Sequence, residues 1–348
     1  MVLKILTIVG ARPQFVKAAT VTRAMQAAPR LTEVMVHTGQ HFDAGMSAVF
    51  FKELGIPDPA HNLGIAGGGH GDMTGRMLMA LEPVLQKEAP AAVLIYGDTN
   101  STLAGALTAA KLHIPVVHVE AGLRSYNRRM PEEVNRVLAD QLSALLLCPT
   151  SAAVANLAKE GITRGVHNVG DVMFDATVHV RNAGLAASTI TSRLGLEDGR
   201  YVVLTLHRAE NTDDPERLRT LTSYVEDRAG ERTIVFPVHP RTRAALAKSH
   251  ASGARMQSID PVGYVDMHRL LAGAHEVYTD SGGLQKEAYF HRVPCITLRE
   301  ETEWVETVAC GWNRLWSVSD YATRREIEEY GDGDAAGRIV QAMIDRLA

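Results

Sequence analysis

The chain has 348 residues and a nearly balanced charge, with 36 Lys and Arg residues against 40 Asp and Glu residues and a net charge of −4 at pH 7. This balance provides no basic field for nucleic acid or an anionic membrane, which excludes partners held by bulk positive charge. The length predicts two domains of roughly 150 to 180 residues each.

Strand-like and helix-like segments alternate along the first half of the chain. Apolar runs rich in β-branched residues predict strands at 3–9, 32–37, 91–96, 115–119 and 145–148. The segments between them predict helices at 15–28, 73–87, 103–112 and 132–142. Residues 1–10 lack the basic region and cleavage site of a signal peptide and are interpreted as a first strand. The longest uncharged run, 141–158, contains several polar residues, so we expect no membrane span.

The same alternation restarts in the second half, where strands are predicted at 201–206, 233–238, 276–279 and 294–298. Such alternation predicts an α/β protein with two Rossmann-like, doubly wound parallel-sheet domains facing a cleft. The first domain is predicted to span residues 1–170 and the second residues 171–334. We expect the last helix, 335–348, to pack back on the first domain.

Acidic residues follow two neighbouring predicted strands and begin the next helix. Asp98 follows the strand 91–96, Glu120 follows 115–119, and Glu132 lies at the start of the helix 132–142. Ligands of open α/β sheets bind at the carboxyl edge of the strands, so these acids should converge there, with Arg124 and Arg136 nearby. The arrangement suits acid/base work on a substrate that carries negative charge.

The segment Gly10 to Lys17 follows the first strand and opens a helix. Pro13 suits a first helical turn and Gly10 permits a tight exit from the strand. Arg12 and Lys17 would both face an anion near that helix start. An ordinary strand–helix turn with two solvated cations is an equally good interpretation of this segment.

A second anion site is indicated at Asp280 to Glu287. Ser281, Gly282 and Gly283 should expose backbone N–H groups at the start of a helix and so form a phosphate cradle without a lysine. Glu287 is placed to accept from two ribose hydroxyls. Arg208, Arg12 and Arg299 could supply the countercharge for a pyrophosphate. The alternative is a plain Gly-rich helix cap.

His207 ends the first strand of the second half and is flanked by Arg208, Glu210 and Asn211. It can take or give a proton near neutral pH. This polar setting favours a functional role over packing for His207. For His239 the sequence leaves both interpretations open.

Several common motifs are absent from the sequence. No strict GxGxxG follows a strand, and there is no Walker lysine motif, HExxH motif or Cys/His cluster, so we expect no nicotinamide, metal or other cofactor. Cys148, Cys295 and Cys310 lack paired spacing and lie in or beside apolar runs, which indicates buried thiols in a reducing cytoplasm. The glycine run 67–71 predicts a flexible loop or a mobile flap.

Nine segments, in chain order, resemble the non-hydrolysing UDP-N-acetylglucosamine 2-epimerases: GARPQFVK, TGQH, GDTNST, HVEAGLR, PEEVNR, LHRAEN, VHPR, DSGGLQKEA and LREETEW. The resemblance implies a glycosyltransferase-B-like fold, a homodimer, and reversible conversion of UDP-GlcNAc to UDP-ManNAc without metal or nicotinamide. It also places the family's catalytic groups on Asp98, Glu120, Glu132 and His207. Its UDP-binding groups fall on Arg12, Lys17, Arg208, Ser281, Gly282, Gln285 and Glu287.

The residues suit the implied chemistry. The C2 proton of an N-acetyl sugar has no adjacent carbonyl to acidify it, so the C1–O bond to UDP should weaken first, and carboxylates would stabilise the resulting cationic centre. Loss of the C2 proton then leaves a 2-acetamidoglucal, and return of a proton on the other face inverts C2. Which acid serves which face stays open.

The resemblance has two departures and leaves alternative functions. Gln14 stands where the family commonly has an acid, and the region that runs from Phe42 and Asp43 into the glycine run lacks, around Gly67 to Asp72, the Gln- and Arg-bearing pattern that binds an activating UDP-GlcNAc in many bacterial members. The GARPQ form is also similar to relatives acting on UDP-2,3-diacetamido-2,3-dideoxyglucuronate. A glycosyltransferase of the same fold and a non-catalytic sugar-nucleotide sensor are the remaining alternatives.

Overall fold

The computed structural model describes residues 2–40, 51, 53–249 and 255–347. These residues form two compact units, one of residues 1–176 with 328–348 and one of residues 177–327. The division falls within helix α7 (Val172–Ala183), and the segment after 327 returns to the first unit, where the Tyr330 carbonyl accepts a hydrogen bond from the Asp171 N–H at 3.0 Å. The predicted boundaries, 170 and 334, therefore differ from this division by a few residues at each crossing, because local sequence does not reveal this backbone pairing.

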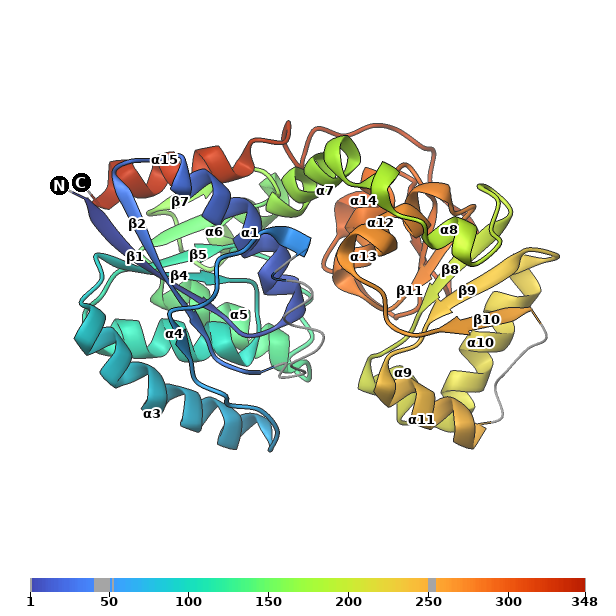
Figure 1. The fold of residues 1–348 in the computed structure, drawn as a ribbon, viewed down its shortest axis with the longest axis horizontal. Helices are drawn as coiled ribbons and strands as arrows, with labels where there is room; N and C mark the ends of the chain where they lie inside the picture. Colours follow the sequence, from blue (N-terminus) through green and yellow to red (C-terminus); the bar gives the residue numbers. More distant parts are fainter. Residues whose placement is uncertain (1, 41–50, 52, 250–254, 348) are drawn as a thin grey trace. The chain divides into compact units, whose positions relative to one another are not determined.

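The first unit is built on a parallel sheet with the strand order β3-β2-β1-β4-β5-β6-β7 (Figure 1). Its strands are β1 (Leu3–Val9), β2 (Leu31–His37), β3 (His61–Asn62), β4 (Ala92–Tyr96), β5 (Val116–Val119), β6 (Leu145–Cys148) and β7 (Val166–Asn168). The strand order reverses between β1 and β4. Polar residues after β1, β4 and β5 therefore lie at the carboxyl edge beside a topological switch point, where ligands of such sheets bind.

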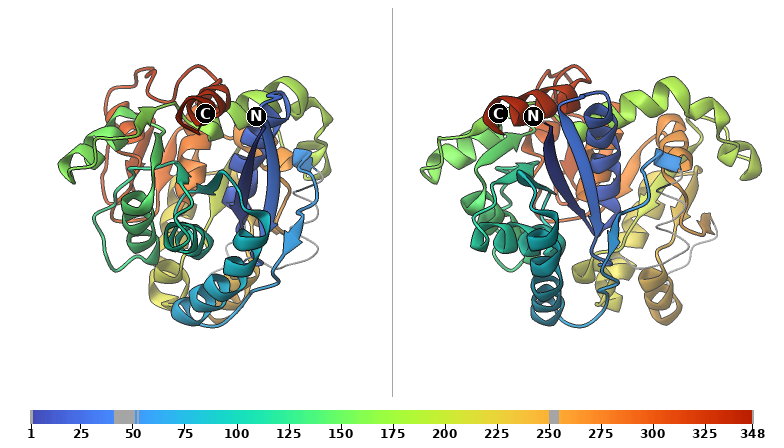
Figure 2. Two further views of the ribbon diagram at one scale, coloured as in Figure 1. Left: turned by 90° about the vertical axis from the view of Figure 1, so that its left-hand side faces the viewer. Right: turned by 60° about the vertical axis from the view of Figure 1, so that its left-hand side comes forward.

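Helices cover both faces of this sheet (Figures 1 and 2). One layer consists of α3 (His70–Glu88), α4 (Asn100–Lys111) and α5 (Pro131–Leu142), which pack side by side. The other contains α1 (Arg12–Gln26) and the C-terminal α15 (Ala335–Leu347), which packs against α1 and β6, while α6 (Ser151–Lys159) connects and contacts β6 and β7. Apolar side chains of α3 and α4 meet those of β1 and β4 in a core that includes Leu6, Val93 and Ala104.

The second unit has a parallel sheet with the strand order β10-β9-β8-β11-β12-β13. Its strands are β8 (Tyr201–Thr205), β9 (Thr233–Pro237), β10 (Met256–Ile259), β11 (Val277–Thr279), β12 (Cys295–Thr297) and β13 (Asn313–Leu315). Its helices are α8 (Ile190–Arg193), α9 (Ala209–Thr212), α10 (Pro215–Ala229), α11 (Pro240–Ser249), α12 (Tyr264–Gly273), α13 (Gly282–Phe290) and α14 (Val305–Ala309), with a 3-10 turn at Leu185–Ala187. Two apolar clusters, around Leu204 and around Val203, pack on opposite faces of the sheet.

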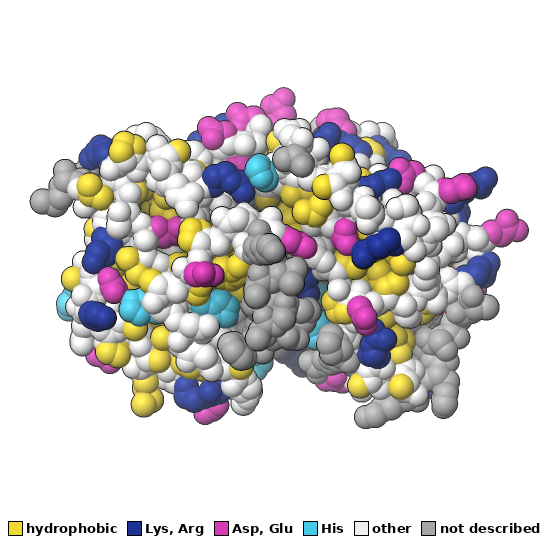
Figure 3. Space-filling model, in the orientation of Figure 1, with side chains coloured by type: hydrophobic (Ala, Val, Ile, Leu, Met, Phe, Trp, Pro, Cys, Tyr) yellow, Lys and Arg dark blue, Asp and Glu magenta, His cyan; other side chains and the backbone are white. Residues whose placement is uncertain are grey.

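The two parallel, doubly wound sheets predicted from the sequence are confirmed. Strands β3, β10 and β13 were missed, because each is short and lacks a long apolar run. The glycine run is only partly a loop: His70 and Gly71 already belong to α3, whose N-cap is Gly69. In the part of the chain that the structure describes, no helix combines the length and apolarity needed to cross a membrane. Basic and acidic side chains are interspersed over the face shown in Figure 3.

Candidate functional site

Asp98 and Glu120 lie at the same edge of the first sheet. Strands β4 and β5 pair in register, with Tyr96 opposite Val119, so the turns that follow them are neighbours. Gly97 has φ +59° and Glu120 has φ +70°. A positive φ is uncommon for a residue with a side chain, and such conformations cluster at functional sites. The backbone thus turns sharply at Gly97, directly before Asp98, and at Glu120 itself.

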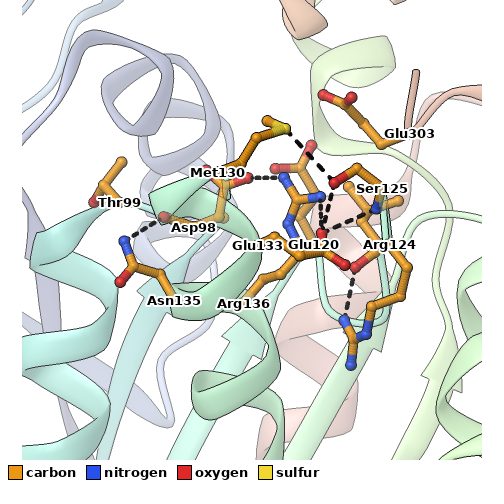
Figure 4. A network of polar contacts seen from close by, with 12 residues as sticks. Asp98, Thr99, Glu120, Arg124, Ser125, Met130, Glu133, Asn135, Arg136 and Glu303 are labelled. Carbon is orange, nitrogen blue, oxygen red and sulfur yellow. Dashed lines mark hydrogen bonds and ion pairs between the residues drawn. The ribbon is translucent and has the colours of Figure 1, made fainter. Parts of the chain in front are cut away.

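Each of these two acids is paired with a cation that comes from a helix. Arg136 of α5 forms an ion pair with Asp98, while Asn135 donates to the Asp98 carbonyl at 2.9 Å (Figure 4). Lys17 of α1 forms an ion pair with Glu120. A Cβ at Gly97 would lie 3.2 Å from both Glu120 Oε2 and Lys17 Nζ. The absence of a side chain at residue 97 therefore leaves room for the Lys17–Glu120 pair.

Glu133, rather than Glu132, organises the entry to α5. Its carboxylate accepts from the N–H groups of Ser125 and Tyr126 at 2.9 Å and from Arg136 Nη1 at 3.0 Å (Figure 4). Glu132 is partly exposed in the first turn of the same helix. Sequence reasoning missed Glu133 and Asn135, although both lie within the PEEVNR segment. The helical period separates the roles of adjacent residues, because Glu132 and Glu133 point in different directions.

The first turn of α1 carries Arg12, a predicted anion-binding residue, and Gln14, the departure from the family pattern. Arg12 is the first residue of α1, and burial lowers the pKa of its guanidinium, with Glu53 acting in the opposite direction. Gln14 is buried: its Oε1 accepts from the Gly10 and Ala11 N–H groups at 2.8 and 3.0 Å, and its Nε2 donates to the Tyr96 carbonyl at 2.9 Å. An amide can satisfy both donors and the acceptor at once, which a carboxylate cannot.

In the second unit, Asp280 organises the predicted histidine site. Its buried carboxylate accepts from the backbone N–H groups of His207 and Arg208, both at 3.0 Å, and lies 3.1 Å from His207 Nδ1. Burial alone would raise the pKa of Asp280, but the facing His207 ring and these N–H groups outweigh it and lower the pKa to about 2. His207 itself is half exposed, so its other ring nitrogen can reach a reactant.

The predicted phosphate cradle is the N-terminus of α13. Ser281 is the N-cap without a side-chain capping bond, and Gly282 and Gly283 are the first helical residues. The first N–H groups of a helix have no intrahelical acceptor, so they can bind an anion. A Cβ at Gly282 would lie 2.4 Å from Glu303 Oε1. Glu303 in turn pairs with the buried Arg299 at 2.9 Å.

Two further residues of α13, Gln285 and Glu287, are buried and contact other side chains. Gln285 is fully buried, and its Oε1 accepts from Thr302 Oγ1 at 2.6 Å and Asn313 Nδ2 at 3.2 Å. These bonds suit a supporting role, which the sequence motif could not distinguish from ligand contact. Glu287 lies 3.6 Å from His268 Nε2, and His268 Nδ1 lies 2.8 Å from His291 Nε2.

The described residues contain no group of three His, Cys, Asp or Glu side chains placed to hold a metal ion. The cysteine thiols are buried, and burial raises the pKa of Cys148 to about 12. Of the region compared with the activating site, Phe42 and Asp43 lie outside the described residues, whereas Gly67 to Asp72 are described. In the glycine run, the carbonyl of Gly67 accepts from Arg76 of α3 at 2.5 Å.

Each unit carries its own set of groups suited to catalysis or anion binding. The first unit carries two carboxylates, each beside a cation, at one sheet edge. The second carries a helix N-terminus for an anion and a histidine oriented by a buried aspartate. Such groups can transfer protons and stabilise a charged reaction centre and an anionic leaving group, with no metal required for any of these roles.

The chain is similar to known proteins that are all named as 2-epimerases of nucleotide sugars. Residues 23–344 match the family model described as UDP-N-acetylglucosamine 2-epimerase. The chain is 50% identical to the UDP-2,3-diacetamido-2,3-dideoxy-D-glucuronate 2-epimerase of Pseudomonas aeruginosa, over 98% of this chain and 99% of that protein. It is 40% identical to the UDP-N-acetylglucosamine 2-epimerase of Methanocaldococcus jannaschii, again over 98% and 99%.

The chain is also similar to solved structures of UDP-GlcNAc 2-epimerases. The crystal structure of the Methanocaldococcus jannaschii UDP-GlcNAc 2-epimerase in complex with UDP-GlcNAc and UDP matches with a TM-score of 0.90 and 39% identity, covering 99% of this chain and all of that one. The Neisseria meningitidis UDP-GlcNAc 2-epimerase bound to UDP-GlcNAc matches with a TM-score of 0.88 and 28% identity, covering 99% and 100%.

Proposed function

This chain belongs to the UDP-N-acetylglucosamine 2-epimerase family, and we propose that it reversibly inverts C2 of a UDP-linked 2-acetamido sugar, converting UDP-GlcNAc to UDP-ManNAc. The observation that carries the proposal is the pair of carboxylates, Asp98 and Glu120, at one sheet edge with Arg136 and Lys17 beside them. Two acids on neighbouring turns supply what removal and return of a proton at one carbon require.

The reaction proceeds by elimination and re-addition of UDP. The bond between C1 and the phosphate oxygen breaks, the C2 proton leaves to a base, and a 2-acetamidoglucal and UDP form. A proton then adds to C2 on the opposite face, while the UDP oxygen adds back to C1. Asp98, Glu120, Glu132 and His207 are the proposed acid and base groups, and the carboxylates also stabilise positive charge at C1.

UDP is assigned to the second unit. The N-terminus of α13, at Ser281, Gly282 and Gly283, is proposed to bind the phosphates, and Glu287 the ribose. Arg12, Lys17, Arg208 and Arg299 are the proposed countercharges, although the ion pair of Lys17 with Glu120 supports a role for Lys17 at the reacting sugar. We further propose a homodimeric, cytoplasmic enzyme that needs no metal, cofactor, nucleic acid or membrane.

A second substrate is favoured by one comparison. The relative from Pseudomonas aeruginosa is 50% identical, against 40% for the UDP-GlcNAc 2-epimerase from Methanocaldococcus jannaschii. UDP-2,3-diacetamido-2,3-dideoxyglucuronate shares the acetamido group at C2 that the chemistry uses. The same acids can therefore invert either sugar, and contacts at C3 and C6 decide between them.

Proton NMR of reactions in D2O tests the proposal. Incubation with UDP-GlcNAc alone, and separately with the diacetamido glucuronate, should yield the 2-epimer carrying deuterium at C2. The faster of the two reactions identifies the substrate. A product that retains the original C2 hydrogen would exclude elimination with solvent exchange. No product from either sugar without an acceptor would favour a glycosyltransferase of the same fold.

A further inference from the structure

A fully buried histidine lies directly behind the two catalytic turns of the first unit. His118 of β5 has no exposed surface. Its Nε2 lies 2.7 Å from the carbonyl oxygen of Gly97, the residue before Asp98. Its Nδ1 lies 2.7 Å from Oδ1 of the buried Asp140 on α5. Both ring nitrogens therefore face oxygen atoms at hydrogen-bond distance.

These two contacts determine the protonation of the ring. A carbonyl oxygen can only accept, so Nε2 must carry a proton. Asp140 Oδ2 accepts from the Gly122 N–H at 3.1 Å and from Arg124 Nη1 at 2.7 Å, which holds the carboxyl in its ionised form. A bare Nδ1 facing this carboxylate would place two lone pairs against each other at 2.7 Å. Nδ1 must carry a proton as well.

The charges around His118 balance when the ring is positive. Asp140 pairs with Arg124, whose Nε and Nη2 also bind the two carboxylate oxygens of Glu160 at 2.7 and 2.8 Å. With a charged His118, two cations face two anions, and with a neutral ring one anion is left in excess. Buried charges are tolerated when they are paired and hydrogen-bonded, so this balance favours the imidazolium. The neighbouring Cys148 adds no charge, because burial raises the pKa of its thiol to about 12.

The buried pair of His118 and Asp140 contacts the turns that carry both catalytic acids. His118 donates to the carbonyl of Gly97, immediately before Asp98. Asp140 accepts from the N–H of Gly122, two residues after Glu120. The two acids therefore sit on turns that share one buried ion pair, and Glu120 has a positive φ in one of these turns.

We propose that His118 is a charged positioning residue, which together with Asp140 holds the turns of Asp98 and Glu120 in the geometry for catalysis. It exchanges no proton with the substrate. The charge state follows from the contacts alone, whereas its consequence for turnover rests on the proposed function.

NMR of the full-length protein labelled with ¹⁵N-histidine tests the charge. Both ring nitrogens of His118 should carry a proton at pH 7, as the contacts to Gly97 and Asp140 require. His118→Gln assigns the signal by its loss. Asp140→Asn provides a second assignment, because the ring should then become neutral and keep only the Nε2 proton. A wild-type His118 with one bare ring nitrogen at pH 7 overturns the proposal.

Kinetics test the positioning. His118→Gln and Asp140→Asn should lower kcat by about 10²-fold, the loss typical of a displacement of roughly 1 Å, with KM and stabilisation by UDP unchanged. His113→Asn, at an exposed residue with φ +58°, is the control and should keep full activity. Wild-type kcat in His118→Gln, or a rise in KM alone, overturns the positioning role. An inactive wild type would instead refute the proposed function, and the NMR result would stand by itself.

Discussion

Lys17 and Glu120 form an ion pair between α1 and the turn after β5, and both side chains are 9% exposed. The resemblance assigned Lys17 to UDP binding. In the structure, its ammonium group instead forms an ion pair with Glu120, a predicted catalytic residue. The pair therefore contributes to the folded state of the first unit as well as to its candidate site.

Lys17→Met should destabilise the protein, because it leaves the nearly buried Glu120 carboxylate without its ammonium partner. Breaking a buried pair in this way costs about 3 kcal/mol or more in the free energy of unfolding. The double variant Lys17→Met/Glu120→Gln should recover most of the loss, since the amide needs no countercharge. Urea denaturation checks this, with the exposed Lys159→Met as control. Equal stability of the single variant and wild type would contradict the argument.

Glu120→Gln and Glu132→Gln should each reduce turnover by about 10²-fold or more while UDP binding persists, because a positioned acid or base contributes that much to the rate. Initial rates by NMR, with UDP binding by calorimetry, separate the two effects. Glu82→Gln, at an exposed residue of α3, should retain full turnover. Near-normal rates in both variants would move the acid/base chemistry to other residues.

UDP should stabilise the protein through α13 and Glu287. A ligand at a hundredfold excess over its Kd adds about 2.7 kcal/mol to the free energy of unfolding, which is visible as a higher Tm. Glu287→Ala should diminish this gain, and Glu231→Ala, an exposed glutamate of the same unit, should leave it intact. The measurement is Tm with and without UDP. An undiminished gain in Glu287→Ala would place the ribose elsewhere.

Asp280 should make stability depend on pH in the acid range. Its pKa in the folded protein is about 2, below its ordinary value, so its contribution is present above the unfolded pKa and is lost as pH falls from about 4 to 2. The shift corresponds to about 2 kcal/mol. Asp280→Asn should flatten Tm against pH over this range, whereas Asp72→Asn, at an exposed ion pair, should not. A wild-type slope in Asp280→Asn would contradict the assignment.

The sequence by itself determined the fold class and the edge of the first sheet that carries the acids. The predicted strands 3–9 and 145–148 coincide with β1 and β6, because a buried parallel strand is a continuous apolar run that local sequence records. The polar residues after such runs, including Asp98, Glu120 and Asp280, must lie at the carboxyl edge whatever packs around them.

Only the tertiary structure decided which partner each side chain has. Lys17 and Glu120 are 103 residues apart in the chain, and Gln14 and Tyr96 are 82 apart, so no local pattern could pair them. The same holds for Gln285, whose burial depends on Thr302 and Asn313. Propensity and periodicity act over a few residues, whereas ion pairs and buried hydrogen bonds form wherever folding brings the groups within about 3 Å. The chain therefore specified its candidate acids locally and their charge environment only through packing.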